Sequence, residues 1–256
     1  LLEIFIPILY GGVLVIPSYE DLVNPKDLID LLYKYKVDIL QGTPSFISHL
    51  LDGINDTNKT FTSLKQICIG GESLNENLVK RIKRKLPEVI INNHYGPTET
   101  VIDATILKDV HSFPQNVIGS PVLNTQIYIL DKEMNIVPLG VEGEICISGE
   151  AIARGILNDQ KKTKEKFIIN PFNENKVLYR SGDIGSWLNN GNIVYSGRKD
   201  DQIKHRGYRV ELGEIEAAIS KHVKVETAIV KSFNDNLHAC IKKKENQYFW
   251  PSLGEY

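Results

Sequence analysis

Residues 64–100 read LKQICIGGESLNENLVKRIKRKLPEVIINNHYGPTET, and this stretch decides the fold class. A strand is expected over residues 64–69, and two glycines end it. Ser73 and Glu76 have capping-box spacing for a helix whose apolar face holds Leu78, Ile82 and Leu86. A second strand is expected at 89–91. Strands that alternate with amphipathic helices at this spacing predict a largely parallel sheet covered by helices.

The N-terminal part of the chain continues this alternation. The apolar run 1–10 predicts a helix that ends at two glycines, and a strand is expected at 13–16. Another helix is expected to begin at Asn24-Pro25, because proline favours the first helical position. The next expected elements are a buried strand and a short helix, at 37–40 and 44–51. Residues 1–114 are therefore expected to form an α/β part.

The pattern changes after about residue 114. Strands are expected at 127–130, 144–148 and 193–195, and Asn190-Gly191 is a strong hairpin signal before the last of them. Residues 115–199 are therefore expected to form a β-rich part. A further unit is expected from 200 to 245, with a helix followed by two strands, at 210–222, 227–231 and 237–241.

Composition excludes several classes of function. The 256 residues are 42% hydrophobic and 24% charged, with a formal charge of −2, so no nucleic-acid partner is expected. The most apolar stretch is too short and too broken to span a membrane. Three widely spaced cysteines favour a reducing compartment, and we expect a cytoplasmic protein. The chain has neither an initiator methionine nor a secretory leader, and it is expected to begin inside a longer sequence.

The segment 92–100, NNHYGPTET, presents an aromatic ring, a hydroxyl and a carboxylate in succession after a strand. An exposed ring can stack on a nucleobase, and a carboxylate with hydroxyls suits Mg²⁺, which takes oxygen ligands and keeps several waters. The alternative is an ordinary turn with a helix cap.

Four later stretches bear on that choice, and with YGPTE they form five motifs in register. They read GEICISG running on to ARG at 143–155, YRSGD at 179–183, GRKDDQ at 197–202 and RGYRVELGEIE at 206–216. In this order and spacing they resemble the adenylate-forming superfamily, and most closely the amino-acid adenylation domains of nonribosomal peptide synthetases. The resemblance extends to about Lys244.

The resemblance implies a fold, a reaction and a set of partners. The fold would be part of a large N-terminal α/β domain over 1–199, a helix-covered sheet plus a β-rich subdomain, followed by the start of a small α+β C-terminal subdomain over 200–245. The family activates an amino acid with ATP and Mg²⁺ as aminoacyl-AMP. It then transfers the acyl group to a phosphopantetheine thiol on a peptidyl carrier domain. Water must be excluded meanwhile, because the adenylate is a mixed anhydride.

The resemblance also implies roles for individual residues. Tyr95 would stack on adenine, and Asn93 would lie near the amino edge of the base. Asp183 would accept hydrogen bonds from both ribose hydroxyls, and Arg198 would add a cationic donor on the ribose and phosphate side. Glu99 would hold Mg²⁺. The complete implied sets are cofactor-binding Gly71, Glu72, Asn93, Tyr95, Gly96, Thr98, Asp183 and Arg198; catalytic Thr98, Glu99 and Lys204; hinge Asp200; and thiol-tunnel Gly207. Alternatives for Asp183 and Arg198 are a hairpin-turn aspartate and a solvated surface arginine.

The substrate pocket implied by the resemblance is lined by Leu2, Ser45, Cys68, Gly70, His94, Ile102 and Asp103. Ser45, His94 and Asp103 place polar groups on its wall, and an unpaired buried polar group costs on the order of 1–3 kcal/mol. A substrate with a polar side chain is therefore expected. The alternative is that His94 and Asp103 satisfy each other and leave the pocket effectively apolar.

The ends of the chain raise further expectations. The phosphate loop of the family belongs before residue 1 and its C-terminal lysine beyond Lys244, so the isolated chain is expected to make little adenylate. Residues 246–256 resemble the start of a methyltransferase inserted into some adenylation domains, which would use S-adenosylmethionine; the alternative is a divergent loop. Alternative functions are a stand-alone acyl- or aryl-CoA ligase and a non-catalytic nucleotide-binding fragment.

Overall fold

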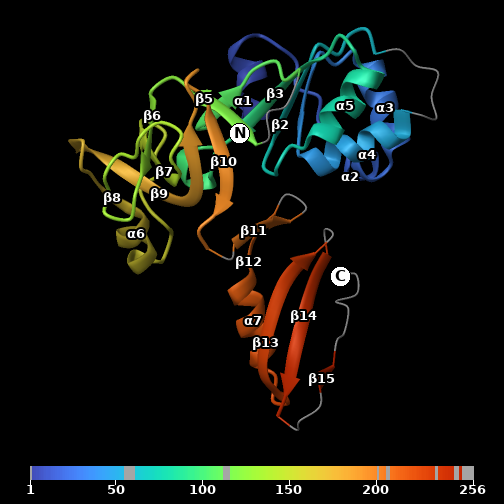
Figure 1. Ribbon diagram of the computed structural model, residues 1–256. Helices are drawn as coiled ribbons and strands as arrows, with labels where there is room; N and C mark the ends of the chain where they lie inside the picture. The colour runs from blue at the N-terminus through green and yellow to red at the C-terminus, as the bar shows by residue number, and fades with distance from the viewer. Residues whose placement is uncertain are drawn as a thin grey trace. The chain divides into compact units, whose positions relative to one another are not determined.

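A computed structural model of the chain describes residues 2–54, 61–111, 116–200, 202–205, 208–233, 236–244 and 248–249. Only the backbone is described for Leu2, Lys204, His205, Arg209, Tyr248 and Phe249. The roles predicted for Gly207, for the side chains of Leu2 and Lys204, and for most of 246–256 therefore lie outside the described residues. The chain divides into two compact units, Leu1–Gly197 and Arg198–Tyr256, both drawn in Figure 1.

The helices of the first unit are α1 (Leu2–Leu9), α2 (Tyr19–Val23), α3 (Pro25–Lys34), α4 (Pro44–Ile54), α5 (Glu76–Lys85), the 3-10 turn η1 (Thr98–Thr100) and α6 (Gln160–Lys166). Its strands are β1 (Ile39–Gly42), β2 (Gln66–Gly70), β3 (Ile90–Tyr95), β4 (Thr105–Leu107), β5 (Val117–Pro121), β6 (Thr125–Leu130), β7 (Gly143–Gly149), β8 (Phe167–Asn170), β9 (Asn173–Trp187) and β10 (Ile193–Arg198).

These strands form one sheet in the order β1-β2-β3-β4-β5-β10-β9-β7-β6, with β8 added beside β9. The expected parallel arrangement is confirmed for β1, β2 and β3. It ends there, because β4 pairs antiparallel with β3 and β5 antiparallel with β4. The strands before and after residue 114 therefore share hydrogen bonds across a single sheet. The α/β fold class expected from the sequence is confirmed.

The helices α3, α4 and α5 group beside the parallel strands (Figure 1). The principal core of this region joins α4 and α5 to alternate residues of β2 and β3, namely Ile47, Leu51, Leu78, Val79, Ile82, Ile67, Ile69 and Ile91. Because side chains alternate along a strand, the residues between these point to the opposite face of the sheet. Cys68, Gly70 and His94 belong to that opposite face.

Local sequence signals account for several element boundaries. Asn24 caps α3 by accepting a hydrogen bond from the Lys26 amide, and Pro25 is its first helical residue, as expected. At the hairpin before β10, the Leu188 amide donates to Asn192 O, and Gly191 has a φ of 77°. Both signals act over a few residues, so the sequence alone is sufficient to place them.

Two expectations about local structure are wrong. Residues 13–16 form no strand, and Val13 and Ile16 are exposed; a strand needs a neighbour for its backbone hydrogen bonds. The helix predicted from a Ser73–Glu76 capping box is present as α5, but its cap is Asn75, whose side chain accepts from the Leu78 amide. An asparagine two residues later offers the same kind of acceptor.

The second unit contains β11 (Gln202–His205), β12 (Tyr208–Glu211), α7 (Leu212–Ser220), β13 (Val225–Phe233), β14 (Asn236–Lys243) and β15 (Tyr248–Phe249). Its core packs α7 against one face of the β13–β14 hairpin around Leu212, Val230 and Ala239. The helix and two strands expected after residue 210 are present at these positions. Across the described part of the chain, no helix is both long and apolar enough to cross a membrane.

Candidate functional site

The turn after β3 requires a glycine at position 96. A Cβ added to Gly96 would lie 2.1 Å from Ile102 O and 2.8 Å from Ala104 N, both of them backbone atoms. The same turn is closed by a hydrogen bond of 2.8 Å from the Ala104 amide to Tyr95 O. The chain therefore folds back on itself directly beyond Tyr95, and only a residue without a side chain fits at the crossing.

Strained backbone lies within this turn. Val101 has a φ of 53° and Ile102 a φ of 78°, in the left-handed region that β-branched residues rarely occupy. Such conformations cost about 1–3 kcal/mol each and cluster at functional sites. Val101 follows η1, which carries Thr98 and Glu99. The strain thus separates Thr98 and Glu99, which are expected to bind the nucleotide and Mg²⁺, from Asp103, which is expected in the substrate pocket.

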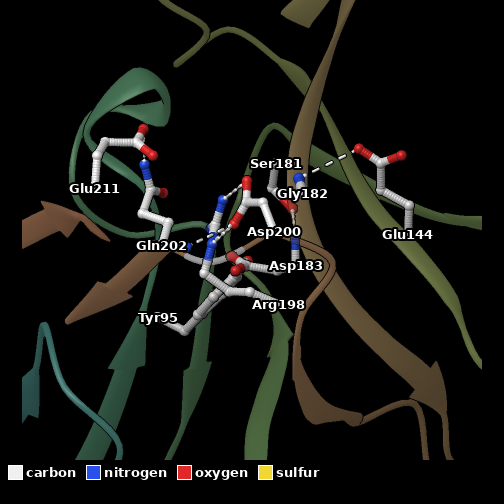
Figure 2. A network of polar contacts seen from close by, with 9 residues as sticks. All are labelled: Tyr95, Glu144, Ser181, Gly182, Asp183, Arg198, Asp200, Gln202 and Glu211. Carbon is white, nitrogen blue, oxygen red and sulfur yellow. Dashed lines mark hydrogen bonds and ion pairs between the residues drawn. The ribbon is translucent and has the colours of Figure 1, made fainter. Parts of the chain in front are cut away.

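Tyr95 and Asp183 meet although they are far apart in the sequence. The Tyr95 hydroxyl donates a hydrogen bond of 2.5 Å to Asp183 Oδ2 (Figure 2). Tyr95 is 6% exposed and Asp183 2% exposed. Burial, and then the charge of Asp183, raise the pKa of Tyr95 well above its ordinary value, so the phenol remains the proton donor. The structure therefore brings together two residues predicted to bind the nucleotide.

Asp183 lies in the middle of a strand. The alternative of a hairpin-turn aspartate is wrong, because residues 179–183 belong to the long strand β9. The pairing of β9 with β7 shifts there, between the Cys146–Arg180 and Glu144–Ile184 pairs, and Gly182 has a φ of 79°. This irregularity is a β-bulge, a feature that often aims a side chain beside an active site.

Three other residues predicted at the nucleotide, Asn93, Gly96 and Thr98, lie at the end of β3 or directly after it. Asn93 is buried on the same face as Tyr95, and its Nδ2 donates to Val117 O at 3.0 Å. The Ala153 amide donates to Glu99 O at 2.8 Å, which joins the ARG segment to η1. Thr98 begins η1. Three of the motifs, YGPTE, GEICISG–ARG and YRSGD, are thus connected by hydrogen bonds within the first unit.

Glu72 lies beside a residue of the predicted substrate pocket. Its carboxylate accepts a hydrogen bond from the Ser45 amide at 3.1 Å and another from Ser45 Oγ at 2.9 Å. Gly71, just before it, has a φ of 85°. The backbone between β2 and Glu72 is therefore bent, and the carboxylate is anchored to the start of α4.

His94 and Asp103 form a partly buried pair on the opposite face of β3 from Tyr95. Nδ1 of His94 lies 2.8 Å from Asp103 Oδ2, and the two side chains are 13% and 12% exposed. Burial by itself lowers the pKa of His94. The hydrogen bonds to Asp103 and Cys68, with the charge of Asp103, outweigh burial and raise the pKa from 6.5 to about 9. Two of the residues predicted to line the substrate pocket thus satisfy part of each other's hydrogen bonding, as one of the two alternatives requires.

This raised pKa predicts a dependence of stability on pH. Because the folded state holds the His94 proton more tightly, the stabilisation is complete below the ordinary pKa of 6.5 and is lost as the pH rises through about 9. A pKa difference of this size contributes on the order of 3 kcal/mol to the free energy of unfolding. Between about pH 6 and about pH 10, the free energy of unfolding measured with urea should therefore fall further in the wild type than in His94→Gln. Equal losses in the two proteins would contradict this account.

In the second unit, Arg198 and Asp200 are paired with each other. Arg198 Nε donates to Asp200 Oδ1 at 2.6 Å and Nη2 donates to Oδ2 at 2.8 Å, a two-pronged contact drawn in Figure 2. The predicted ribose ligand and the predicted hinge residue are thus direct partners. The ribose and hinge roles remain predictions.

The sequence motifs contain a polar residue to which no role was given. Glu144 in β7 is buried, and its carboxylate contacts both Arg180 and the Gly182 amide. Glu144 falls inside the GEICISG motif, so that motif was the available signal, but only the strand pairing shows what the carboxylate contacts. Among the described residues, no three acidic, histidine or cysteine side chains are grouped so as to hold a metal ion.

Comparison with known proteins agrees with the motif pattern. Residues 1–157 match the family described as AMP-binding enzyme. The chain is 40% identical over 228 residues to gramicidin S synthase 2 of Brevibacillus brevis, a match covering 89% of this chain and 5% of that protein. It is 39% identical over 237 residues to tyrocidine synthase 3 of Brevibacillus parabrevis, covering 93% and 4%. The chain therefore spans about one twentieth of the length of these relatives.

Solved structures confirm the fold. PA1221, an NRPS protein containing adenylation and PCP domains, superposes with a TM-score of 0.80 at 25% identity, over 96% of this chain and 50% of that one. IdnL1 superposes with a TM-score of 0.79 at 23% identity, over 91% and 48%. The resemblance expected from the five motifs is confirmed by these matches.

Proposed function

This chain belongs to the AMP-binding enzymes, and on that premise we propose that it forms the nucleotide-binding part of an amino-acid adenylation domain in a nonribosomal peptide synthetase. The full-length protein would activate an amino acid with ATP as aminoacyl-AMP and transfer it to phosphopantetheine on a carrier domain. The observation that carries the proposal is the buried contact between Tyr95 and Asp183. It joins two distant motifs at one point.

The polar groups around Asp183 are suited to binding a nucleotide. An ionised carboxylate offers about four acceptor positions, so Asp183 can accept ribose hydroxyls as well as the Tyr95 hydroxyl. Asp183 would then orient the ribose, and Asn93 and Tyr95, on the same face of β3, would border the base. Glu99, with Thr98 beside it, would hold Mg²⁺ together with the phosphates, the arrangement that this ion prefers. Bound Mg²⁺ would neutralise the charge of the transferring phosphate.

The substrate is proposed to be an amino acid with a polar side chain. The His94–Asp103 pair is already hydrogen-bonded, yet it carries opposite charges in a partly buried wall. Covering such a pair with an apolar side chain would remove its remaining water without supplying a new partner, which is unfavourable. A polar side chain could replace that water. The cytoplasm is proposed as the compartment, on the basis of three widely spaced cysteines.

ATP–pyrophosphate exchange by the full-length protein tests this function. With a panel of amino acids, exchange should be fastest for a polar side chain, and the product should be transferred to a carrier domain in preference to free coenzyme A. Preference for leucine, valine or phenylalanine would exclude the polar-substrate proposal. Efficient release of a coenzyme A thioester would favour an acyl-CoA ligase, and nucleotide binding without exchange would exclude the adenylation activity.

A further inference from the structure

The bulge that presents Asp183 is larger than a single inserted residue. On β7, Cys146 and Glu144 pair with Arg180 and Ile184 on β9, so Ile145 alone lies opposite residues 181–183. An unpaired stretch of this kind exposes backbone groups that the strand ladder no longer satisfies. Something other than the ladder must therefore fix the direction in which Asp183 points.

Side chains replace the missing ladder bonds. Ser181 Oγ donates to Ile145 O at 2.6 Å and accepts from the Asp183 amide at 2.9 Å. Glu144 Oε1 accepts from the Gly182 amide at 3.2 Å, as Figure 2 shows. Ser181, Gly182 and Asp183 are thus each held by at least one hydrogen bond that does not belong to the strand ladder.

The carboxylate of Glu144 is itself held in place. Its Oε2 accepts a hydrogen bond of 2.7 Å from Arg180 Nη2, and Glu144 is only 7% exposed. The contact with Glu144 raises the pKa of Arg180, so the guanidinium stays charged and balances the buried carboxylate. Both oxygens of Glu144 therefore accept hydrogen bonds, one from Arg180 and the other from the Gly182 amide in the bulge.

We propose that Glu144 is a positioning residue for the nucleotide: by bonding the Gly182 amide from the Arg180 ion pair, it fixes the bulge that aims Asp183 at the ribose. This inference rests on the proposed function, because it assumes that Asp183 binds the ribose hydroxyls. Glu144 itself would not touch the nucleotide. Its loss should therefore weaken ribose recognition and leave recognition of the amino acid unchanged.

The test compares ATP with 3′-deoxy-ATP in pyrophosphate exchange by the full-length protein. The readout is the ratio of kcat/KM for the two nucleotides, which reports contacts with the ribose, and the KM for the amino acid is the internal reference. Asp183→Ala sets the value for a lost ribose ligand. Glu150→Ala is the matched control, because Glu150 also joins the β7 end to β9 through Lys176, but at the surface.

Glu144→Ala should lower the preference for ATP by about tenfold, the effect of one misaligned charge-assisted hydrogen bond. The amino-acid KM should change less than about twofold, and Glu150→Ala should leave both quantities unchanged. If Glu144→Ala does not fold, Glu144→Gln serves. Arg180 and the Gly182 amide donate to different oxygens of Glu144, and glutamine replaces one of these oxygens with an NH₂ group that cannot accept. Glu144→Gln should lower the preference for ATP by about threefold.

The possible outcomes distinguish a failure of the positioning role of Glu144 from a failure of the ribose role of Asp183. If Asp183→Ala abolishes the preference and the Glu144 variants retain it in full, the positioning role is wrong and the ribose role stands. If Asp183→Ala also retains the preference, the proposed ribose role of Asp183 is wrong. A parallel rise in the amino-acid KM would indicate general disruption of the sheet and overturn the positioning role.

Discussion

Replacement of Asp183 by alanine in the full-length protein is expected to lower kcat/KM for ATP in pyrophosphate exchange by about 100-fold or more. Two charge-assisted hydrogen bonds to the ribose hydroxyls would be lost, each contributing about 1.5 kcal/mol or more. The substitution also removes the acceptor of the buried Tyr95 hydroxyl, 2.5 Å away. The effect should appear for every amino acid substrate, because the ribose is common to all of them.

Two further variants serve as comparisons for Asp183→Ala. Tyr95→Phe keeps the carboxylate and removes its internal donor, so it should lower kcat/KM for ATP by less than Asp183→Ala, about tenfold. Asp131→Ala removes an aspartate after β6 whose side chain accepts hydrogen bonds from Asn135, four residues along the chain, and activity should not change. A loss of less than about threefold in Asp183→Ala, with a normal melting temperature, would mean that the ribose lies elsewhere.

The second large effect is expected from Gly96→Ala. A Cβ at this position would lie 2.1 Å from Ile102 O and 2.8 Å from Ala104 N, so the turn must open. Neither atom belongs to a flexible side chain that could move away. We expect the free energy of unfolding to fall by about 3 kcal/mol or more, as in severe overpacking. Adenylation should fall with it, because the same turn carries Thr98 and Glu99.

Gly213→Ala is the matched control for this prediction. Nothing lies within 4 Å of a Cβ added to Gly213, which is in the helix α7. Alanine stabilises a helix relative to glycine by up to about 1 kcal/mol. Urea unfolding should therefore show a strong loss for Gly96→Ala and none for Gly213→Ala. Equal midpoints for the two variants would show that the turn is not tightly closed.

The parts of the fold that the sequence predicts are those that local chemistry decides. Asn24 and Pro25 start α3, and the Asn190-Gly191 signal makes the hairpin before β10, because each acts within a few residues. The strand expected at 13–16 is absent because a strand also needs a partner, and no local pattern supplies one. The antiparallel continuation of the sheet through β4 likewise depends on pairing with β5, which lies beyond the local pattern.

The candidate site shows the same division. The motif resemblance selects Tyr95 and Asp183, but their contact spans 88 residues and is visible only in the structure. The bulge at Asp183 depends on the register between β7 and β9, which neither strand's residues determine alone. Glu144 was missed for that reason. His94 and Asp103 are only nine residues apart, and their pairing was one of the two alternatives that the sequence offered.

A crystal structure of the full-length protein with AMP and Mg²⁺ would be the most direct examination of this account. We predict that the two ribose hydroxyl oxygens lie about 3 Å from the carboxylate of Asp183, with the bulge at 181–183 unchanged. AMP bound at a distance from Asp183, with that carboxylate still engaged only by protein groups, would contradict it.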